Sequence, residues 1–273
     1  MTLAEAIRRL RDAGVDSPAH DAREIFATLG EVSSADLLFP DSEADDNKVA
    51  GAIARRAARE PLQYILGEVG FYRELYHVSP DCLIPRAETE LLADFAVRHL
   101  PRGARFLDLC TGSGCVAVSV LRHTEQTTAV AVDLSRGALA VARKNAARYA
   151  LGARIEFLLA DATREIFPAE ERFFAVLANP PYVSRDAYAA LAPEIGYEPR
   201  EAFVGGEDGG DFYRALIPLY KNHLPPDGFL AFEIGYDQSD LLVALAAENG
   251  MKATISRDLS DLPRLAVLTF PSA

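Results

Sequence analysis

From residue 105 onward the chain alternates apolar runs with amphipathic stretches, and this alternation limits the folds that it can adopt. Helical patterns at 115–121 and 136–150 separate some of the apolar runs. Strands that alternate with helices form parallel sheets with helices on both faces. We therefore predict an α/β fold with a doubly wound, mostly parallel, seven-stranded sheet. Its expected strands are 105–109, 128–132, 154–159, 173–178, 229–234, 252–256 and 265–270.

The first 66 residues differ, because their apolar residues recur at helical spacing. Thr2 and Glu5 have the spacing of a capping box, and Leu3, Ile7 and Leu10 follow on one helical face. This pattern predicts a small helical bundle, which we expect to dock the substrate or form a lid, with a purely structural role as the alternative. Further helices are expected from Ser17-Pro18, as cap and first helical residue, to Gly30, over 33–39 and over 47–59.

Residues 61–67 break the helical period, and a strand pattern follows them. Val69, Phe71, Leu75 and His77 alternate with more polar neighbours, which predicts a β-hairpin. The hairpin would connect the bundle to the α/β region. The expected domains are a helical bundle at 1–66, a hairpin connector at 67–85 and the α/β domain at 86–273.

Composition argues against several kinds of partner. The chain has 28 basic and 40 acidic side chains, for a formal net charge of −12. A net negative surface does not attract polyphosphate, so we expect no stable nucleic-acid binding. The start of the chain has neither a signal-peptide pattern nor a membrane-length apolar stretch, which predicts a cytoplasmic protein without membrane contact. Cys82, Cys110 and Cys115 lack the spacing of a metal site, so no metal is expected.

A glycine-rich loop follows the first strand of the predicted sheet. Residues 110–114 read Cys-Thr-Gly-Ser-Gly and lead into a helix. Glycines here allow a sharp turn and a close approach of the backbone to a ligand. Gly112 and Gly114, with the acid Asp133 about 20 residues later, also match the fingerprint of a nicotinamide or flavin dinucleotide site. The loop therefore predicts a nucleotide cofactor, which is either a dinucleotide or S-adenosylmethionine.

Three acidic residues at strand ends help to separate these cofactors. Asp108 directly precedes the loop, where it would repel a pyrophosphate but attract the ammonium and sulfonium charges of S-adenosylmethionine. Asp133 is placed to accept hydrogen bonds from the ribose hydroxyls of either cofactor. Asp161 is placed to accept from the adenine amine, although it equally fits a helix cap. The acids together favour S-adenosylmethionine.

The buried run at 173–178 ends at the tetrapeptide Asn179-Pro180-Pro181-Tyr182. The prolines lack N–H groups and keep the backbone extended, so they leave carbonyl oxygens without competing donors. Asn179 adds an amide oxygen and Tyr182 a flat ring, a combination that suits a planar NH2 group. Asn-Pro and Pro-Pro also mark ordinary turns, an interpretation slightly favoured for the tetrapeptide alone. Together with the cofactor acids, the tetrapeptide indicates methyl transfer to a planar nitrogen.

These motifs resemble those of class I S-adenosylmethionine-dependent methyltransferases, and in particular the HemK-type release factor glutamine methyltransferases. The matching stretches are 59–67, 83–90, 108–114 and 198–209, with Glu233-Ile234-Gly235 and Gln238. The resemblance therefore runs from about residue 59 to the end of the chain. The amino-terminal helices agree in kind but carry no distinctive motif.

The resemblance implies a Rossmann-like methyltransferase that acts in translation termination. Its implied substrate is the glutamine side chain in the Gly-Gly-Gln loop of class I peptide chain release factors, and S-adenosylhomocysteine is the implied product. The expected catalytic and substrate-binding residues are Asn179, Pro180, Pro181 and Tyr182. The expected cofactor-binding residues are Asp108, Thr111, Gly112, Ser113, Gly114, Cys115, Asp133, Asp161, Ala162 and Asn179. Ala162 departs from the family, whose members often have a large aromatic residue there.

Other functions fit parts of the pattern. A methyltransferase acting on the amino group of adenine in nucleic acid would use a similar tetrapeptide after base flipping, but the acidic charge argues against it. A nicotinamide-dependent oxidoreductase fits the glycine loop and would leave residues 179–182 without a role. A binding module without catalysis would leave both the tetrapeptide and the acids unexplained.

Overall fold

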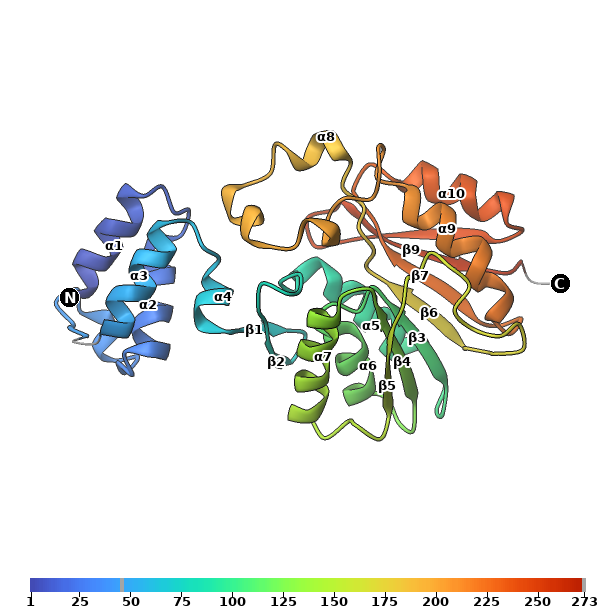
Figure 1. Cartoon of the computed structure of the whole chain (residues 1–273), viewed down its shortest axis with the longest axis horizontal. Helices are drawn as coiled ribbons and strands as arrows, with labels where there is room; N and C mark the ends of the chain where they lie inside the picture. The colour runs from blue at the N-terminus through green and yellow to red at the C-terminus, as the bar shows by residue number, and fades with distance from the viewer. Residues whose placement is uncertain (45–46, 272–273) are drawn as a thin grey trace. The chain divides into compact units, whose positions relative to one another are not determined.

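A computed structural model describes residues 1–44 and 47–271 of the chain (Figure 1). The chain separates into two compact units. The first comprises Met1–Val69 together with Ala192–Glu198. The second comprises Gly70–Leu191 and the chain from Pro199 onward. A short segment from late in the sequence is thus part of the amino-terminal unit.

The first unit is a helical bundle, as the apolar spacing predicts. Its α1 helix begins with the expected capping box, since Glu5 N donates to Thr2 Oγ1 and Thr2 N donates to Glu5 Oε2. Ser17 is the N-cap residue of α2 and Pro18 its first helical residue, as predicted, but Ser17 does not cap the helix with its side chain. Ser17 has φ −122° and ψ 59°, and its side chain makes no cap hydrogen bond among the described residues. The helices are α1 (Leu3–Asp12), α2 (Pro18–Leu29), η1 (Asp36–Leu38), α3 (Asn47–Ala57) and α4 (Leu62–Leu66).

The short α4 helix lies where the sequence predicted only an end to the helical period. Pro61 precedes it with φ −53°, a value that suits the start of a helix. Gly67 follows it with φ +79°, in the left-handed region that glycine adopts readily. Leu62 and Ile65, one turn apart, are buried in the bundle core. Proline and glycine therefore mark the two ends of a helix here.

A chain of charged side chains holds the late segment within the first unit. Arg56 is only 7% exposed and donates to Asp21 (2.7 Å) and to Glu194 (3.1 Å). Arg59 donates through Nε and Nη2 to both oxygens of Glu194, at 2.6 and 2.8 Å. Burial acts to raise the pKa of Glu194, but hydrogen bonds from Arg59, its own backbone and Arg56 outweigh burial and lower it. Glu194 thus binds its segment to α3 and to the residues that follow it through ionic hydrogen bonds.

The second unit contains the predicted seven-stranded sheet (Figure 1). The strand order is β5-β4-β3-β6-β7-β9-β8, and β9 runs antiparallel to the other six strands. The prediction of a doubly wound, mostly parallel sheet is therefore confirmed. The strands are β3 (Arg105–Leu109), β4 (Thr128–Asp133), β5 (Ile155–Leu159), β6 (Ala175–Ala178), β7 (Phe229–Glu233), β8 (Lys252–Arg257) and β9 (Pro263–Thr269).

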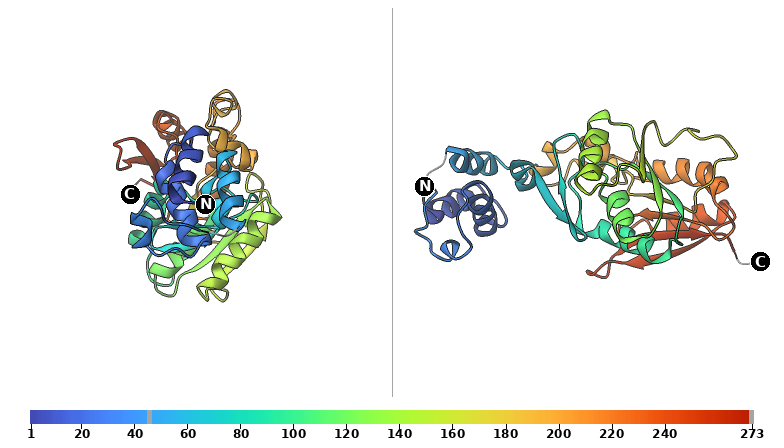
Figure 2. Two further views of the ribbon diagram at one scale, coloured as in Figure 1. Left: turned by 90° about the vertical axis from the view of Figure 1, so that its left-hand side faces the viewer. Right: turned by 90° about the horizontal axis from the view of Figure 1, so that it is seen from below.

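Helices cover both faces of this sheet (Figures 1 and 2). One group of helices comprises α5 (Glu90–His99), α6 (Cys115–His123) and α7 (Arg136–Arg148), and a second group comprises α9 (Asp211–Tyr220) and α10 (Ser239–Glu248). Leu107 and Leu109 pack into one core with the second group, so Asp108 between them points to the opposite face. Shorter helices of this unit are η2 (Ala87–Thr89), α8 (Arg185–Tyr188), η4 (Arg200–Ala202) and η5 (Lys221–His223), whereas η3 (Pro193–Tyr197) belongs to the first unit.

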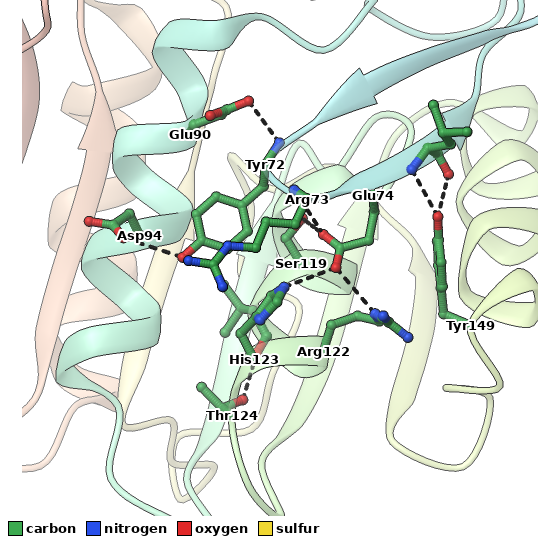
Figure 3. Close-up of polar contacts among 12 residues, drawn as sticks. Tyr72, Arg73, Glu74, Glu90, Asp94, Ser119, Arg122, His123, Thr124 and Tyr149 are labelled. Atoms are coloured by element: carbon green, nitrogen blue, oxygen red, sulfur yellow. Dashed lines mark hydrogen bonds and ion pairs between the residues drawn. The ribbon is translucent and has the colours of Figure 1, made fainter.

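The predicted hairpin is present as β1 (Glu68–Phe71) and β2 (Glu74–His77), but its apolar alternation was misleading. Leu75 is 46% exposed, whereas Glu74 is buried. Arg122 Nε donates to Glu74 Oε1 at 3.2 Å, and His123 Nε2 lies 2.9 Å from the same oxygen (Figure 3). These partners on α6 satisfy the carboxylate, so its burial is tolerated.

Replacing Glu74 with alanine should lower the free energy of unfolding by about 2 kcal/mol, because it removes a buried carboxylate and leaves its partners unpaired. The loss is smaller than for a fully buried pair, since the Arg122 side chain is 40% exposed and can return to water. Urea unfolding would measure it. Arg98→Ala, which breaks an exposed pair with Asp94, should cost under about 0.5 kcal/mol and serves as the control. Equal effects of the two substitutions would contradict this account.

Two kinds of feature are absent from residues 1–44 and 47–271. No helix there has the length and apolar character needed to cross a membrane. No group of three or more His, Cys, Asp or Glu side chains there is arranged to hold a metal ion.

Candidate active site

The strand order changes direction at β3, and the two predicted motifs meet at this point. β3 pairs with β4 on one side and with β6 on the other. Leu109, the last residue of β3, is in register with Ala178, the last residue of β6. The glycine loop and the tetrapeptide therefore begin on adjacent strands. Ligands of open α/β sheets bind at such a switch point, beyond the carboxyl ends of the strands.

The glycine loop needs its left-handed backbone and small residues. Gly114 has φ +79°, and a Cβ atom there would lie 3.0 Å from the Cβ of Ala142 on α7. Cys110 also has a positive φ, +57°, which is uncommon for a residue with a side chain. Asn145 Nδ2 donates to the carbonyl of Ser113 at 2.8 Å and fixes the middle of the loop. The loop is thus held as a tight turn before α6.

A small cavity lies at this turn. It brings together six of the predicted site residues. Arg86 and Thr89, to which the sequence assigned no role, also line it. The described residues lining the cavity are Leu83, Pro85, Arg86, Thr89, Asp108, Cys110, Thr111, Gly112, Ser113, Cys115, Val116 and Asn179.

Asp108 is a buried carboxylate in the wall of this cavity. Its Oδ2 atom accepts hydrogen bonds from Thr111 Oγ1 (2.6 Å) and from Ala117 N (3.2 Å). Burial raises the pKa of Asp108 to about 7, against the opposing effect of these two hydrogen bonds. Both bonds end on the same oxygen, so a ligand donor can use the other one. A cationic ligand would favour the ionised carboxylate.

Ser113 supplies an independent sign of a polar ligand. Its Oγ atom is buried and has no nitrogen or oxygen partner within the described part of the chain, and its polar neighbour is the Cys115 thiol. A buried hydroxyl without a partner costs roughly 1–3 kcal/mol, so such atoms call for an explanation. Ser113 lines the same cavity as Asp108. The cavity therefore offers a polar ligand an unfilled hydrogen-bonding position.

Asp133 lies at the end of β4, beside the glycine loop, but it is not among the described residues that line the cavity. Gly112 N donates to its Oδ2 and Ser135 N donates to its Oδ1, each at 2.8 Å. Burial raises the pKa of Asp133, and these backbone hydrogen bonds oppose the rise. Each oxygen retains a second lone pair. The carboxylate thus helps to hold the loop, and its predicted ribose contact stays a prediction.

Asp161 and Ala162 also lie apart from the described lining of the cavity. Asp161 accepts from Thr163 N and Oγ1, at 2.9 and 2.6 Å, and from Arg164 Nε at 3.0 Å. These bonds lower the pKa of Asp161, and the bond from the Thr163 hydroxyl has the largest effect. They stabilise a turn where the alternative interpretation expected a helix cap. Ala162 is buried, and its carbonyl accepts from Tyr220 at 3.0 Å. A contact of either residue with adenine stays a prediction.

The tetrapeptide after β6 is tied to two residues, Thr89 and Glu233, to which the sequence analysis assigned no role. Asn179 Nδ2 donates to Thr89 Oγ1 at 3.1 Å, and Tyr182 OH donates to Glu233 Oε1 at 2.9 Å. Thr89 Oγ1 donates to the other oxygen of Glu233 at 2.5 Å. One signal was available for Glu233, since it is a carboxylate at the end of an otherwise apolar buried strand. Thr89 offered no comparable signal.

The glycine-rich segment at 203–209 packs directly against the tetrapeptide. Val183 N donates to Phe203 O, and Gly205 N donates to Val183 O at 2.9 Å. A Cβ atom at Gly205 would lie 2.3 Å from the carbonyl oxygen of Pro181, which no side chain allows. Pro181 is itself buried. The segment therefore fixes the backbone whose carbonyl groups the tetrapeptide presents.

The sheet order, the glycine loop after the central strand and the acceptor-rich tetrapeptide on the next strand define a Rossmann-like methyltransferase. A solved structure, the ribosomal protein L11 methylase from Lactobacillus delbrueckii subsp. bulgaricus, shares this fold. Its TM-score is 0.52 at 19% identity, and the match covers 71% of this chain and 84% of that one. Residues 2–67 match the PrmC N-terminal domain model, and residues 87–196 match the methyltransferase small domain model.

Curated relatives identify the family. This chain is 38% identical to the release factor glutamine methyltransferase of Caulobacter vibrioides, over 93% of this chain and 89% of that protein. It is also 38% identical to the Cereibacter sphaeroides enzyme of the same name, over 99% and 98%. The Koribacter versatilis enzyme of that name is 34% identical over the whole of both chains. The chain belongs to the release factor glutamine methyltransferase family, which confirms the resemblance seen in its motifs.

Proposed function

We propose that this chain transfers a methyl group from S-adenosylmethionine to the side-chain amide nitrogen of the glutamine in the Gly-Gly-Gln loop of class I peptide chain release factors. Family membership supports the reaction. The observation that carries the assignment is the position of Asn179, which lines the same cavity as the glycine loop. Its Nδ2 is occupied by Thr89, so Oδ1 is the atom left to accept from an amide.

The residues of the cavity fit S-adenosylmethionine. The amino acid end of this cofactor carries an ammonium and a carboxylate, and the cavity wall offers Asp108 and Arg86 as opposite charges. Ser113 Oγ would gain a partner, and Thr111 to Cys115 would surround the methionine portion. Asp133 would hold the ribose, and the Asp161 and Ala162 region the adenine. The cofactor supplies an electrophilic methyl group on a sulfonium.

The protein must act mainly by positioning, because an amide nitrogen is a poor nucleophile. Its lone pair is delocalised into the carbonyl group. Hydrogen bonds from the glutamine NH2 group to Asn179 Oδ1 and the Pro180 carbonyl would orient the nitrogen for attack, with the large advantage of prearranged reactants. The nitrogen would gain positive charge as its bond to the methyl carbon forms and the carbon–sulfur bond breaks, so both acceptors would bind the transition state more strongly than the ground state. S-adenosylhomocysteine would be the leaving group, and the methylated nitrogen would then lose its extra proton to solvent. Tyr182 offers its ring as a flat wall.

A labelling experiment tests this function. Purified protein is given S-adenosylmethionine labelled in its methyl group, together with a class I release factor, the same factor with the Gly-Gly-Gln glutamine replaced by alanine, or nucleic acid. Label is expected only in the unmodified release factor, on one glutamine by mass spectrometry. Label in nucleic acid would favour the adenine amino-group alternative, and label in the substituted factor would overturn the assigned target.

Asp133→Ala is expected to weaken S-adenosylmethionine binding about tenfold, through loss of hydrogen bonds to the ribose and of the bond that holds Gly112. The maximal rate at saturating cofactor should fall much less. Calorimetric titration measures the affinity. Asp227→Ala, at an exposed turn far along the chain, is the matched control and should bind normally. Unchanged affinity in Asp133→Ala would count against the ribose role.

A further inference from the structure

The tetrapeptide is connected to a buried hydrogen-bond relay that the reaction itself does not use. The relay runs from Asn179 Nδ2 to Thr89 Oγ1, and from Thr89 Oγ1 to Glu233 Oε2. Tyr182 OH donates to Glu233 Oε1, so both carboxylate oxygens have a partner. The four residues come from three separate parts of the second unit. Thr89 and Glu233 are each only 2% exposed.

We propose that Thr89 and Glu233 are positioning residues that determine which end of the Asn179 carboxamide faces the substrate. The proposal rests on the proposed function of Asn179 as an acceptor for the glutamine amide. It adds that the acceptor is selected by a carboxylate that lies two hydrogen bonds away.

The direction of each hydrogen bond follows from the chemistry of the groups. An ionised carboxylate only accepts, so Thr89 must donate its single hydroxyl hydrogen to Glu233. Thr89 is then able only to accept from Asn179. The carboxamide of Asn179 must therefore turn its NH2 group toward Thr89, which leaves Oδ1 for the substrate. The negative charge of Glu233 thus fixes the orientation of an amide that could otherwise bind either way round.

A contribution to fold stability does not explain why a carboxylate, Glu233, occupies this buried position. Its carboxylate is buried at the end of the apolar strand β7, and burial raises its pKa, although the hydrogen bonds from Thr89 and Tyr182 oppose the rise. A buried charge is costly, and a packed apolar residue at such a position is often as stable or more stable. The positive charge of Arg264 favours the ionised carboxylate, but Arg264 Nη1 donates to the neighbouring carbonyl of Ile234, at 3.3 Å, and within the described residues no hydrogen bond joins Arg264 to the carboxylate itself. The contacts of Glu233 lead instead to Asn179 and Tyr182.

Loss of the relay would affect the reaction more than the binding of the cofactor. Without an acceptor at residue 89, the Asn179 amide can rotate and present its NH2 group to the NH2 group of the glutamine. Two donors facing each other cannot form the hydrogen bond that orients the nitrogen. The expected effect is therefore on kcat, while Asp108, Ser113 and the glycine loop continue to hold S-adenosylmethionine.

Three substitutions test the proposal in the full-length protein with a release factor as substrate. Thr89→Val keeps the shape of the side chain but removes the hydroxyl, and should lower kcat by about 10- to 100-fold. Thr89→Ser restores the hydroxyl and should return kcat to within about threefold of wild type. Glu233→Gln keeps the size but can donate to Thr89, which frees the Thr89 hydrogen for Asn179 Oδ1, and should resemble Thr89→Val. The dissociation constant for S-adenosylmethionine should stay within about threefold throughout.

A double substitution separates positioning from a general structural role. Once Asn179 is alanine, nothing remains to be oriented, so adding Thr89→Val should cause little further loss of kcat. A multiplicative loss in the double variant would overturn the proposal. So would wild-type kcat in Thr89→Val, or equal damage from the valine and serine substitutions.

Nuclear magnetic resonance gives a readout that does not depend on the release factor. The side-chain NH2 signal of Asn179, assigned by its absence in Asn179→Ala, should shift in Thr89→Val and return in Thr89→Ser. An unchanged signal would overturn the relay even if activity falls. If wild-type protein fails to methylate the release factor, the proposed function falls, and this signal still decides whether Thr89 orients Asn179.

Discussion

Replacing Asn179 with alanine is expected to reduce the rate of methyl transfer by about 10²- to 10³-fold. This factor corresponds to about 3 kcal/mol of transition-state stabilisation, the typical loss when one preorganised polar partner is removed. Asn179 Oδ1 would accept from a nitrogen that becomes more positive during the reaction, so its contribution grows toward the transition state. The affinity for S-adenosylmethionine should fall much less, because Asn179 is one of many residues around the cofactor cavity.

Single-turnover kinetics with saturating cofactor and release factor would measure this effect directly. Asn222→Ala, at an exposed position outside the site, is a suitable control and should react at the wild-type rate. Near-normal turnover by purified Asn179→Ala would refute its assignment. A loss confined to cofactor affinity would place Asn179 among the cofactor ligands alone.

Asp108→Asn should weaken S-adenosylmethionine binding by roughly 10- to 100-fold near pH 7.5, the range for one charged hydrogen bond. The substitution is unusually clean, because Thr111 and Ala117 both donate to the same oxygen of Asp108. The asparagine oxygen can accept both bonds. Its NH2 group then faces the cavity, where it opposes the ammonium of the cofactor with a second donor.

The pH dependence of binding provides a second test of Asp108. Burial raises the pKa of this carboxyl to about 7 in the folded protein. A cationic ligand prefers the ionised form, so wild-type affinity should increase from about pH 6 to about pH 7.5, with proton release on binding at the lower pH. Calorimetry in two buffers of different ionisation enthalpy measures that release. Asp108→Asn should lose both effects, and pH-independent binding by wild type would contradict the ammonium role.

Stability should change with pH in the opposite sense. The carboxyl has an ordinary pKa of 3.8 when unfolded and about 7 when folded, so the folded protein binds more protons between these values. The free energy of unfolding of ligand-free wild type should therefore fall, relative to Asp108→Asn, as the pH rises from about 4 to about 7. Urea unfolding at several pH values would show this. A constant difference between the two proteins would mean that the pKa is not raised.

The sequence predicted the sheet well because the apolar periodicity of a buried strand is a local property. The same local pattern failed at the hairpin, where it assigned Leu75 to the buried face. The burial of Glu74 depends on Arg122 and His123, nearly fifty residues away, and no local pattern contains that information. The α4 helix was missed because Pro61 and Gly67, seen in the sequence alone, indicate that no helix forms there. Proline and glycine also occur at the two ends of a helix, which is where they lie in this case.

The meeting of the glycine loop and Asn179 could be predicted from the sequence because it follows from the topology of the sheet. Adjacent parallel strands place their carboxyl ends together, so the glycine loop and Asn179 meet whatever the side chains do. The partners of Asn179 were not accessible in this way. Thr89 is 90 residues from Asn179 and 144 residues from Glu233, and only the folded chain joins them. Asp133 and Asp161 were expected to face a ligand, yet both also support their own loops.

The ionic contacts of Glu194 bear on how the amino-terminal bundle can be studied in isolation. A fragment that stops after residue 67 would contain Arg56 and Arg59 but not the carboxylate that both of them bind. In such a fragment Arg56 would keep its ion pair with Asp21, but Arg59 would lose both hydrogen bonds to its carboxylate partner. Binding of a release factor to the truncated bundle would then overstate attraction to acidic partners. A fair excision needs a linker that brings Ala192–Glu198 along.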